Sequence, residues 1–247
     1  MKTVACMATY PARASTIEAA AASIARQVDQ LNICFNEYDR FPAWLEKYPN
    51  IDAAIPVQNF IDVGKFCFDV DPQDEVVLVD DDILYPVNYV SELRRHRCVL
   101  GLSDVIVGVH GVIYADLFDG SASARRVFHF QSALNRYRVV NQLGTGTVLL
   151  KGFQMPSRPF LAGSERYVDL RFAVYAHRNR WPMVCVPREA NWLNEQESGT
   201  SIFADFTERW PEAVVRESQE IAGYAKLDLS VVADVVSRST AMQTDQA

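Results

Sequence analysis

The sequence EVVLVDDD at residues 75–82 decides the fold, because a strand-like run ends there in three consecutive aspartates. Residues 76–79 are uninterrupted apolar side chains, which is the pattern of a central parallel strand covered on both faces. Open α/β sheets bind their ligands at the carboxyl ends of such strands, and Asp80, Asp81 and Asp82 stand at that position. The stretch therefore predicts an α/β sheet with a polar site at one edge.

Strand-like and helix-like segments alternate along the chain, which indicates an α/β domain with a mainly parallel central sheet flanked by helices. The helix at about 15–28 is predicted to open with a capping box between Ser15 and Glu18. Residues 138–150 are predicted to form paired strands around a glycine turn, and residues 112–137 to be rich in loops. Strands are expected at 3–9, 30–35, 51–57, 75–79, 105–109 and 183–187, and helices at 87–97 and 167–180.

Composition limits the classes of protein to which the chain can belong. The 247 residues include 24 Lys plus Arg and 31 Asp plus Glu, which gives a formal net charge of −7. Because nucleic-acid backbones are bound by clustered positive charge, this balance argues against nucleic acid as a partner. The length fits one large domain or two small ones. We expect one domain at 1–203, followed by a helical C-terminal extension at 204–247 with a frayed tail.

Neither an export signal nor a transmembrane segment is apparent. The apolar run at 4–8 is too short for a signal peptide, and no run approaches the roughly 18 apolar residues of a membrane helix. The five cysteines have no metal-binding spacing, and Cys6, Cys34 and Cys185 are predicted to be buried free thiols, which suits a reducing cytosol. One reactive thiol among the five stays open as an alternative. We expect a cytoplasmic protein, with a peripheral position at the inner face of the membrane as an option.

The three aspartates have a chemistry of their own. Adjacent carboxylates repel one another, so the cluster costs stability unless a cation or hydrogen-bond donors compensate. Hard oxygen ligands select Mg²⁺ or Mn²⁺, and Mg²⁺ usually takes one or two protein carboxylates together with substrate phosphates. In an extended chain, Asp80 and Asp82 would point to one side and Asp81 to the other. A solvated acidic turn is the alternative interpretation.

Seven short segments, spread over roughly residues 3–200, carry a resemblance to a known family. They are MATYPAR (7–13), CFNEYD (34–39), DVGKF (62–66), VLVDDDILYPVNYV (77–90), VGVHGV (107–112), LGTGTVLL (143–150) and YVDLRFAVYA (167–176). In this order they resemble the nucleotide-diphosphosugar glycosyltransferases of the GT-A fold, most closely bacterial family-2-like enzymes of capsule and surface-polysaccharide synthesis. The resemblance implies a single GT-A-like, Rossmann-type domain. It also implies metal-dependent, inverting transfer of a sugar from a nucleotide sugar, a UDP-sugar by preference, to a hydroxyl of a glycan or glycolipid acceptor.

The resemblance implies a donor-binding set at the carboxyl edge of the sheet. The turn after the first strand holds the nucleobase in this family, with a Tyr face available for stacking and an Arg for the diphosphate or a base carbonyl. A plain surface turn is the alternative there, and a solvated side chain is the alternative for the lysine. The implied donor-binding residues are Thr9, Tyr10, Pro11, Arg13, Asn36, Lys65, Asp80 and Asp81.

The same resemblance implies metal ligands and a catalytic base. Asp82 is the expected direct ligand of Mn²⁺ or Mg²⁺, Asp80 binds the metal through water or meets the ribose, and His110 is the candidate third ligand. The later metal histidine of many GT-A enzymes is missing here. Asp169, in the first turn of a predicted helix, is the implied base that deprotonates the acceptor hydroxyl, with Glu165 as the runner-up. The structural alternative for Asp169 is that it complements the helix N-terminus.

Three other classes compete with the transferase. An Asp-x-Asp phosphatase would carry its motif on the first strand, whereas this motif follows a later one. A sugar-nucleotide pyrophosphorylase would have a glycine-rich basic loop after the first strand, which TYPAR at 9–13 does not match. A non-catalytic protein that binds a sugar or a partner could keep the same fold, although the intact Asp motif argues against it.

Overall fold

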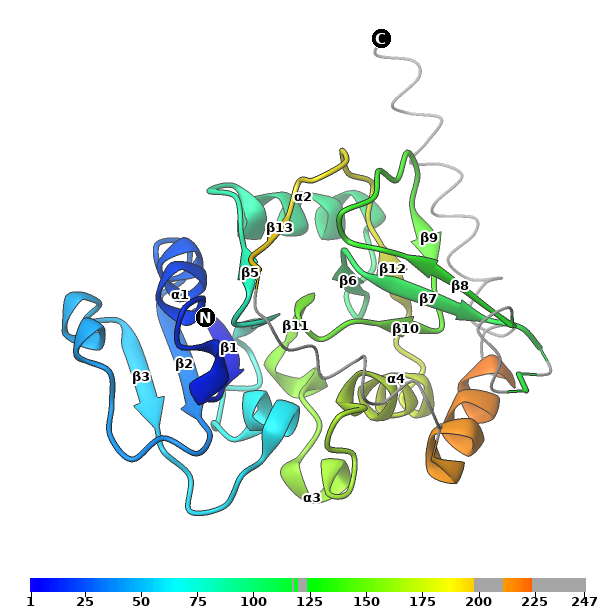
Figure 1. Cartoon of the computed structure of the whole chain (residues 1–247). Coiled ribbons are helices and arrows are strands. Elements are labelled where there is room, and N and C mark those ends of the chain that lie inside the picture. The colour runs from blue at the N-terminus through cyan, green and yellow to red at the C-terminus, as the bar shows by residue number, and fades with distance from the viewer. Residues whose placement is uncertain (117, 120–123, 198–210, 224–247) are drawn as a thin grey trace, which may run out of the picture.

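An eight-stranded central sheet organises the molecule (Figure 1). The computed structural model describes residues 1–116, 118–119, 124–197 and 211–223. In spatial order the strands are β3 (Ile51–Ala54), β2 (Gln30–Phe35), β1 (Thr3–Thr9), β4 (Glu75–Val79), β11 (Thr147–Lys151), β6 (Ile106–Gly108), β12 (Met183–Cys185) and β9 (Arg138–Val139). Only β11 and β9 run antiparallel to the other strands of this sheet. The mainly parallel α/β architecture predicted from the sequence is confirmed.

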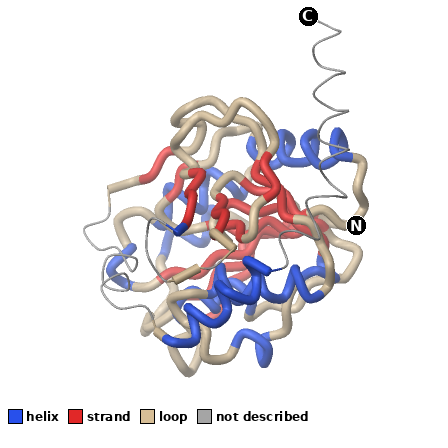
Figure 2. Tube along the Cα trace, turned by 90° about the vertical axis from the view of Figure 1, so that its right-hand side faces the viewer, coloured by secondary structure: helices blue, strands red, loops and turns tan. Residues whose placement is uncertain are grey.

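Helices cover both faces of the sheet, so that two hydrophobic cores form (Figure 2). The decisive stretch lies between these cores. Val76 and Leu78 of β4 belong to one core, Val77 and Val79 belong to the other, and all four are fully buried. The prediction of a strand covered on both faces is therefore confirmed. One core contains α1 (Ile17–Ala25) and α2 (Tyr89–Leu100), and the other contains η3 (Ile61–Phe66), α3 (Arg158–Leu161) and α4 (Val168–Arg178).

Short elements complete the fold, and some of them lie where the sequence predicts loops. A three-stranded sheet in the order β10-β7-β8 occupies part of the region at 112–137. The sequence pattern of this region is irregular, and pairing between the strands orders it. The bounds are β5 (Ile83–Leu84), β7 (Gly111–Tyr114), β8 (Arg125–Phe128), β10 (Gln142–Leu143) and β13 (Asn194–Glu195), with 3-10 turns η1 (Pro11–Arg13), η2 (Ala43–Lys47) and η5 (Gly152–Gln154).

The predicted capping box is wrong. Helix α1 begins at Ile17 with Thr16 as its N-cap, and no side chain caps its first turn. The Thr16 hydroxyl instead donates to the Arg13 carbonyl at 3.1 Å. The 3-10 turn η1 runs almost directly into the helix, and the Thr16 amide donates to the Arg13 carbonyl of this turn at 3.0 Å.

The predicted pairing within 138–150 is also wrong. Strand β10 pairs with β7, whereas β11 lies between β4 and β6 in the central sheet. Residues Val148, Leu149 and Leu150 are fully buried and contribute to both cores, which is the environment of a central strand and not of a surface hairpin. The glycine turn carries the chain from the small sheet to the central one.

Part of the predicted C-terminal extension belongs to the core of the domain. The structure describes residues 211–223 of it, which are helical from 212, and Val214, Ile221 and Ala222 pack in the same core as α4. The rest of the extension, including the tail expected to fray, lies outside the described residues. Over the described ranges, none of the helices combines the length and the apolar character needed to cross a membrane.

Candidate active site

The three aspartates lie where β4 ends, but their side chains do not alternate as an extended chain would place them. The backbone turns at Asp81 and Asp82. Asp80 contacts the Lys65 ammonium, whereas Asp81 and Asp82 both face the Arg13 guanidinium. The extended conformation under which Asp80 and Asp82 would share one side ends at this turn, and the two carboxylates contact different cations of the chain.

Arg13 is buried against the acidic motif. Its Nη1 lies 3.1 Å from Asp82 Oδ2, and its Nε lies 3.9 Å from Asp81 Oδ1. The Tyr10 ring covers the guanidinium, with 5.9 Å between Arg13 Cζ and the ring centroid. Burial raises the pKa of Asp81 to about 7 and that of Asp82 to about 6, and the neighbouring carboxylates add to both shifts. Arg13 thus neutralises the charges of Asp81 and Asp82 only in part.

A second group of contacts joins Asp80 to Asp169. The Lys65 side chain is buried, and its Nζ contacts Asp80 Oδ1 and lies 3.5 Å from the Thr145 hydroxyl. Thr145 in turn donates to Asp169 Oδ1, from its amide at 2.8 Å and from its hydroxyl at 2.5 Å. The two carboxylates that the sequence singled out, one after β4 and one in the first turn of α4, therefore meet at one edge of the sheet.

Opposite charges hold this group together. Burial by itself lowers the pKa of Lys65, yet the charges of Asp80 and Asp169 outweigh burial and the net direction is upward. Burial raises the pKa of Asp169, and Lys65 and Thr145 oppose the rise. Lys65 is thus a fixed cation between two carboxylates, and Asp169 is a carboxylate shifted toward the protonated form.

Asp169 does not cap its own helix, because its Oδ1 accepts from Thr145. The start of α4 is bound instead by Asp62 of η3, whose carboxylate accepts from the Arg166 amide at 2.8 Å and from the Val168 amide at 3.4 Å. Burial raises the pKa of Asp62 to about 6. A different aspartate therefore fills the structural role that was the alternative for Asp169.

The Asp80 carboxylate occupies the space that a side chain at position 146 would need. A Cβ at position 146 would lie 1.8 Å from Asp80 Oδ2, far inside van der Waals contact. The Tyr85 hydroxyl accepts from the Asp80 amide at 2.8 Å and donates to the Gly146 carbonyl at 2.7 Å, so that it fixes both backbones. The glycine at 146 is therefore needed for the close approach of the Asp80 side chain.

The remaining residues of the expected donor-binding set differ in how deeply they are buried. Thr9 is buried at the end of β1, and Pro11 is exposed at the start of η1. Asn36 is buried, and both ends of its amide are engaged, because Oδ1 accepts from the Phe60 amide at 2.8 Å and Nδ2 donates to the Ile61 carbonyl at 3.0 Å. Asn36 therefore supports the start of η3, the element that carries Lys65.

Replacing Asn36 with Ala should lower the free energy of unfolding by about 1–3 kcal/mol, because Phe60 and Ile61 each lose a partner. The matched control is Asn59→Ala, which removes a bond from the Ile61 amide to an exposed side chain (2.8 Å) and should cost about 0.5 kcal/mol or less. Urea unfolding measures both. Equal costs would contradict the supporting role of Asn36.

His110 follows β6 at the same edge but contacts aromatic rings. Its ring centroid lies 5.4 Å from that of His129 and 6.1 Å from that of Phe130, and its Cβ and ring lie against Gly144. Burial lowers the pKa of His110 to about 4, and the charge of His129 adds to the shift, so that its imidazole is neutral at pH 7. Over the described parts of the chain, no group of three or more His, Cys, Asp or Glu side chains is placed to hold a metal ion.

The donor set nevertheless suits a divalent cation. Asp81 Oδ2 is buried and has no hydrogen-bond partner within the described residues. Mg²⁺ usually needs only one or two protein carboxylates when substrate phosphates supply the other oxygens, and Asp80 and Asp82 can provide them. The carboxylates of the cluster outnumber its cations, with Asp62, Asp80, Asp81, Asp82 and Asp169 set against Arg13 and Lys65.

Some parts of this site carry little signal in the sequence. Thr145 and Gly146 lie in the GTGT stretch at 144–147, where the sequence predicts a glycine turn and no contact with Asp80 or Asp169. Asp62 lies in the DVGKF segment, and its helix-capping role depends on contacts with residues about a hundred positions away. Tyr85 has no sequence signal, because only the folded chain places its hydroxyl between two backbones.

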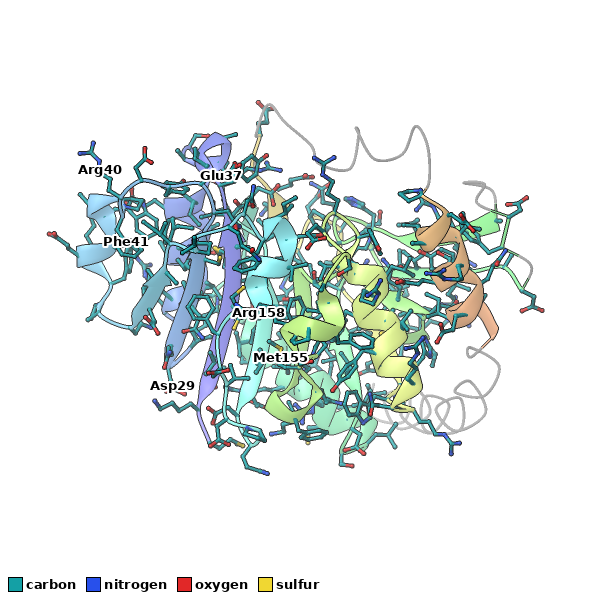
Figure 3. All side chains as sticks on the ribbon, turned by 90° about the horizontal axis from the view of Figure 1, so that it is seen from below. Asp29, Glu37, Arg40, Phe41, Met155 and Arg158 are labelled. Atoms are coloured by element: carbon teal, nitrogen blue, oxygen red, sulfur yellow. The ribbon has the colours of Figure 1, made fainter. Side chains whose placement is uncertain are left out.

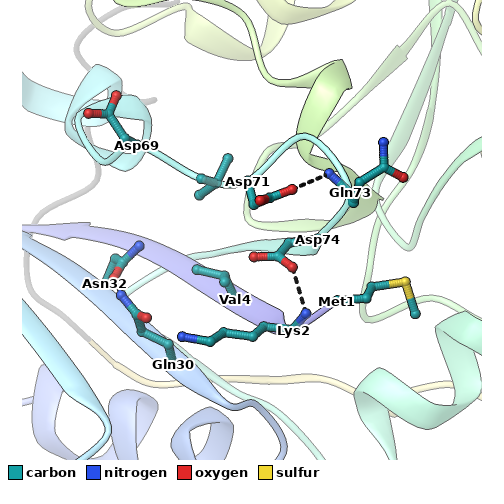
Figure 4. Close-up of a pocket in the computed structure, with 10 residues that line it drawn as sticks. Met1, Lys2, Val4, Gln30, Asn32, Asp69, Asp71, Gln73 and Asp74 are labelled. Carbon is teal, nitrogen blue, oxygen red and sulfur yellow. Dashed lines mark hydrogen bonds between the residues drawn. The ribbon is translucent and has the colours of Figure 1, made fainter.

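A separate hollow lies at the opposite edge of the sheet, near the amino end of β1 (Figure 4). It has a volume of about 580 Å³, and its lining includes several aspartates and Lys2. Two of these aspartates are already engaged by backbone amides: Asp74 accepts from Lys2 at 2.6 Å, and Asp71 accepts from Gln73 at 2.8 Å. We therefore place the candidate active site at the carboxyl edge.

The site thus combines carboxylates suited to a cation with a carboxylate suited to accept a proton, and a buried lysine lies between them. The chain matches no family model, and no curated protein matches it. Its function is therefore inferred from the geometry of the site.

Proposed function

We propose that the protein is a metal-dependent, inverting glycosyltransferase of the GT-A type. It transfers a sugar from a nucleotide-diphosphate sugar, a UDP-sugar in the first instance, to a hydroxyl of a glycan or glycolipid acceptor. The observation that carries the proposal is the junction of Asp80 and Asp169 through Lys65 and Thr145 at the carboxyl edge of the sheet. A cytoplasmic location, with a peripheral position at the inner face of the membrane as an option, is part of the same proposal.

The donor lies across the carboxyl ends of β1 and β4. The Tyr10 ring stacks on the base, and the Arg13 guanidinium beneath it orients the acidic motif. The Lys65 ammonium is the fixed positive charge closest to the diphosphate. Asp80 and Asp82 would hold a Mn²⁺ or Mg²⁺ ion, and its charge would stabilise the departing nucleoside diphosphate.

Asp169 acts as the general base in this proposal. Thr145 engages Oδ1 with two hydrogen bonds, which fixes the carboxylate and leaves Oδ2 for the acceptor. Oδ2 takes the proton of the acceptor hydroxyl while that oxygen attacks the anomeric carbon from the face opposite the leaving group. Attack from that face inverts the anomeric configuration.

The test uses a panel of nucleotide sugars with Mn²⁺. The correct donor stabilises the native state, by about 2.7 kcal/mol at a hundred times its Kd, so the melting temperature identifies it. We then expect release of nucleoside diphosphate that EDTA abolishes and Mn²⁺ restores. Asp82→Asn should lose the rise in melting temperature caused by Mn²⁺, whereas Asp52→Asn, at an exposed residue of β3, should keep it.

Three outcomes would count against the proposal. Release that is unaffected by EDTA would remove the metal from the mechanism. Formation of the nucleotide sugar from a sugar phosphate and a nucleoside triphosphate would favour a pyrophosphorylase. Tight binding of a sugar without turnover would favour a non-catalytic binding protein.

A further inference from the structure

Two free cysteines from different elements meet beside the candidate site. Cys34 lies near the end of β2 and Cys67 immediately follows η3, and each thiol shifts the pKa of the other. The Cys34 thiol donates to Asn36 Oδ1 at 3.8 Å, and the Cys67 thiol donates to the Val63 carbonyl at 3.9 Å. The backbone geometry agrees with this contact. A Cβ at Gly64 would lie 2.9 Å from Cys34 Sγ, and the Cys67 amide donates to the Gly64 carbonyl at 3.2 Å. Because residues three apart in a 3-10 turn share a face, Cys67 lies on the side of η3 that meets Cys34.

The two thiols have unequal surroundings. Cys34 is almost fully buried, whereas Cys67 is partly exposed. Arg158 of α3 (labelled in Figure 3) supplies a positive charge that acts on the Cys67 thiol. The contact with Cys34, with Arg158 adding to it, lowers the pKa of the Cys67 thiol, while the pKa of Cys34 is raised by its contact with Cys67 and by burial. Reactive cysteines sit in partly exposed, electropositive surroundings of this kind.

We infer that Cys67 is a site of oxidation by a peroxide and that Cys34 resolves the oxidised form as a disulfide. The Cys67 thiolate attacks one peroxide oxygen, the O–O bond breaks, and the thiol becomes a sulfenic acid while the other oxygen leaves as hydroxide. Cys34 sulfur then attacks Cys67 sulfur and displaces hydroxide, which leaves as water with the Cys34 proton. Two thiols and one peroxide thus give one disulfide and two waters.

The disulfide would join β2 directly to the end of η3. A disulfide holds its sulfur atoms about 2.05 Å apart, which is closer than two thiols without a covalent bond can approach, so the end of η3 moves toward β2. Lys65 stands two residues before Cys67, and its contact with Asp80 depends on the position of η3. Oxidation is therefore expected to disturb the Lys65–Asp80 pair, and reduction to restore it.

The formation of this disulfide does not depend on the proposed transferase activity, so its test uses mass spectrometry. The reduced full-length protein is treated with equimolar hydrogen peroxide, blocked with an alkylating reagent and digested without reductant. We expect a peptide pair joined through Cys34 and Cys67. The pair should be absent in Cys67→Ser and still present in Cys98→Ser, a change at an exposed thiol of α2.

Two further variants separate the roles of the neighbours. Cys34→Ala should stop the reaction at a sulfenic acid on Cys67, which a dimedone adduct reports. Arg158→Gln should raise the pKa of the Cys67 thiol and so slow its oxidation, by about threefold for each unit of the rise. The rate falls because the smaller fraction of thiolate outweighs the higher nucleophilicity of that thiolate. Peroxide that modifies Cys98 while Cys34 and Cys67 stay reduced would overturn the inference.

Discussion

Asp169→Asn is expected to lower the rate of nucleoside diphosphate release by about 10²–10⁴-fold, which is the contribution of a positioned general base. The asparagine keeps the size of the side chain and an oxygen that can accept from Thr145, so the start of α4 stays in place. It has no basic oxygen for the proton of the acceptor or of water. Initial rates of donor hydrolysis, in which water replaces the acceptor, measure the effect.

The matched control is Glu165→Gln, which changes the alternative base at the turn before α4. We expect this variant to keep nearly the full rate, because Glu165 lines a hollow with Phe60 and Arg158 and does not belong to the contacts that join Asp80 to Asp169. A large loss in Glu165→Gln together with a normal rate in Asp169→Asn would reverse the assignment. Melting temperatures of both variants show whether either change acts through unfolding.

The pH profile gives an independent check on Asp169. Burial raises its pKa above the ordinary value of 3.8, so the protonated, inactive form persists to a higher pH than for an exposed aspartate. The rate is expected to fall as the pH drops through this raised pKa. In Asp169→Asn the part of the acid limb that belongs to Asp169 should disappear, whereas protonation of Asp81 (pKa about 7) and Asp82 (pKa about 6) should still lower the residual rate.

The sequence predicts the parts of this molecule that depend on local pattern. The apolar run of β4 is buried on both faces whichever strands flank it, so its place in the sheet follows from the run alone. The position of Asp80 at the carboxyl end then follows from the direction of the strand. For Asp169 the pattern predicts only its place in the first turn of a helix, and its role as a base is implied by the family resemblance.

The features that the sequence does not predict depend on contacts between distant segments. Nothing local to Asn36 indicates that Phe60 and Ile61 engage both ends of its amide. The turn at Asp81 and Asp82, which brings both carboxylates to Arg13, depends on the burial of that arginine beside them. A pattern can indicate which residue types are present at an edge, but the partner of each one is set by packing.

Gly146→Ala is expected to impair the site far more than the fold. The added Cβ would lie 1.8 Å from Asp80 Oδ2 and 2.3 Å from Asp80 Cγ, so the carboxylate must rotate away. The Asp80 side chain is 39% exposed and has room to move, which limits the loss of stability to about 1–3 kcal/mol. Its contact with Lys65 is lost, and a displacement of about 1 Å at a reacting centre can cost about 10²-fold in rate.

Two other glycines separate a general effect of the substitution from an effect at the site. A Cβ at Gly223 has nothing within 4 Å, so Gly223→Ala should change neither rate nor stability appreciably. A Cβ at Gly152 would lie 2.0 Å from the Asp71 backbone oxygen, so Gly152→Ala should destabilise the protein strongly. Its folded fraction should keep the normal rate, because the clash lies at the other end of β11.

The double variant Gly146→Ala with Asp80→Ala decides between a steric clash and a backbone effect. If the Asp80 carboxylate is the atom group displaced, truncating it removes the clash, and the double variant should be more stable than Gly146→Ala alone. The rate should stay low, because the carboxylate itself is gone. The steric account would be contradicted if the double variant lost as much stability as the two single variants together. Such additivity would show that the alanine at 146 destabilises the protein independently of the Asp80 side chain.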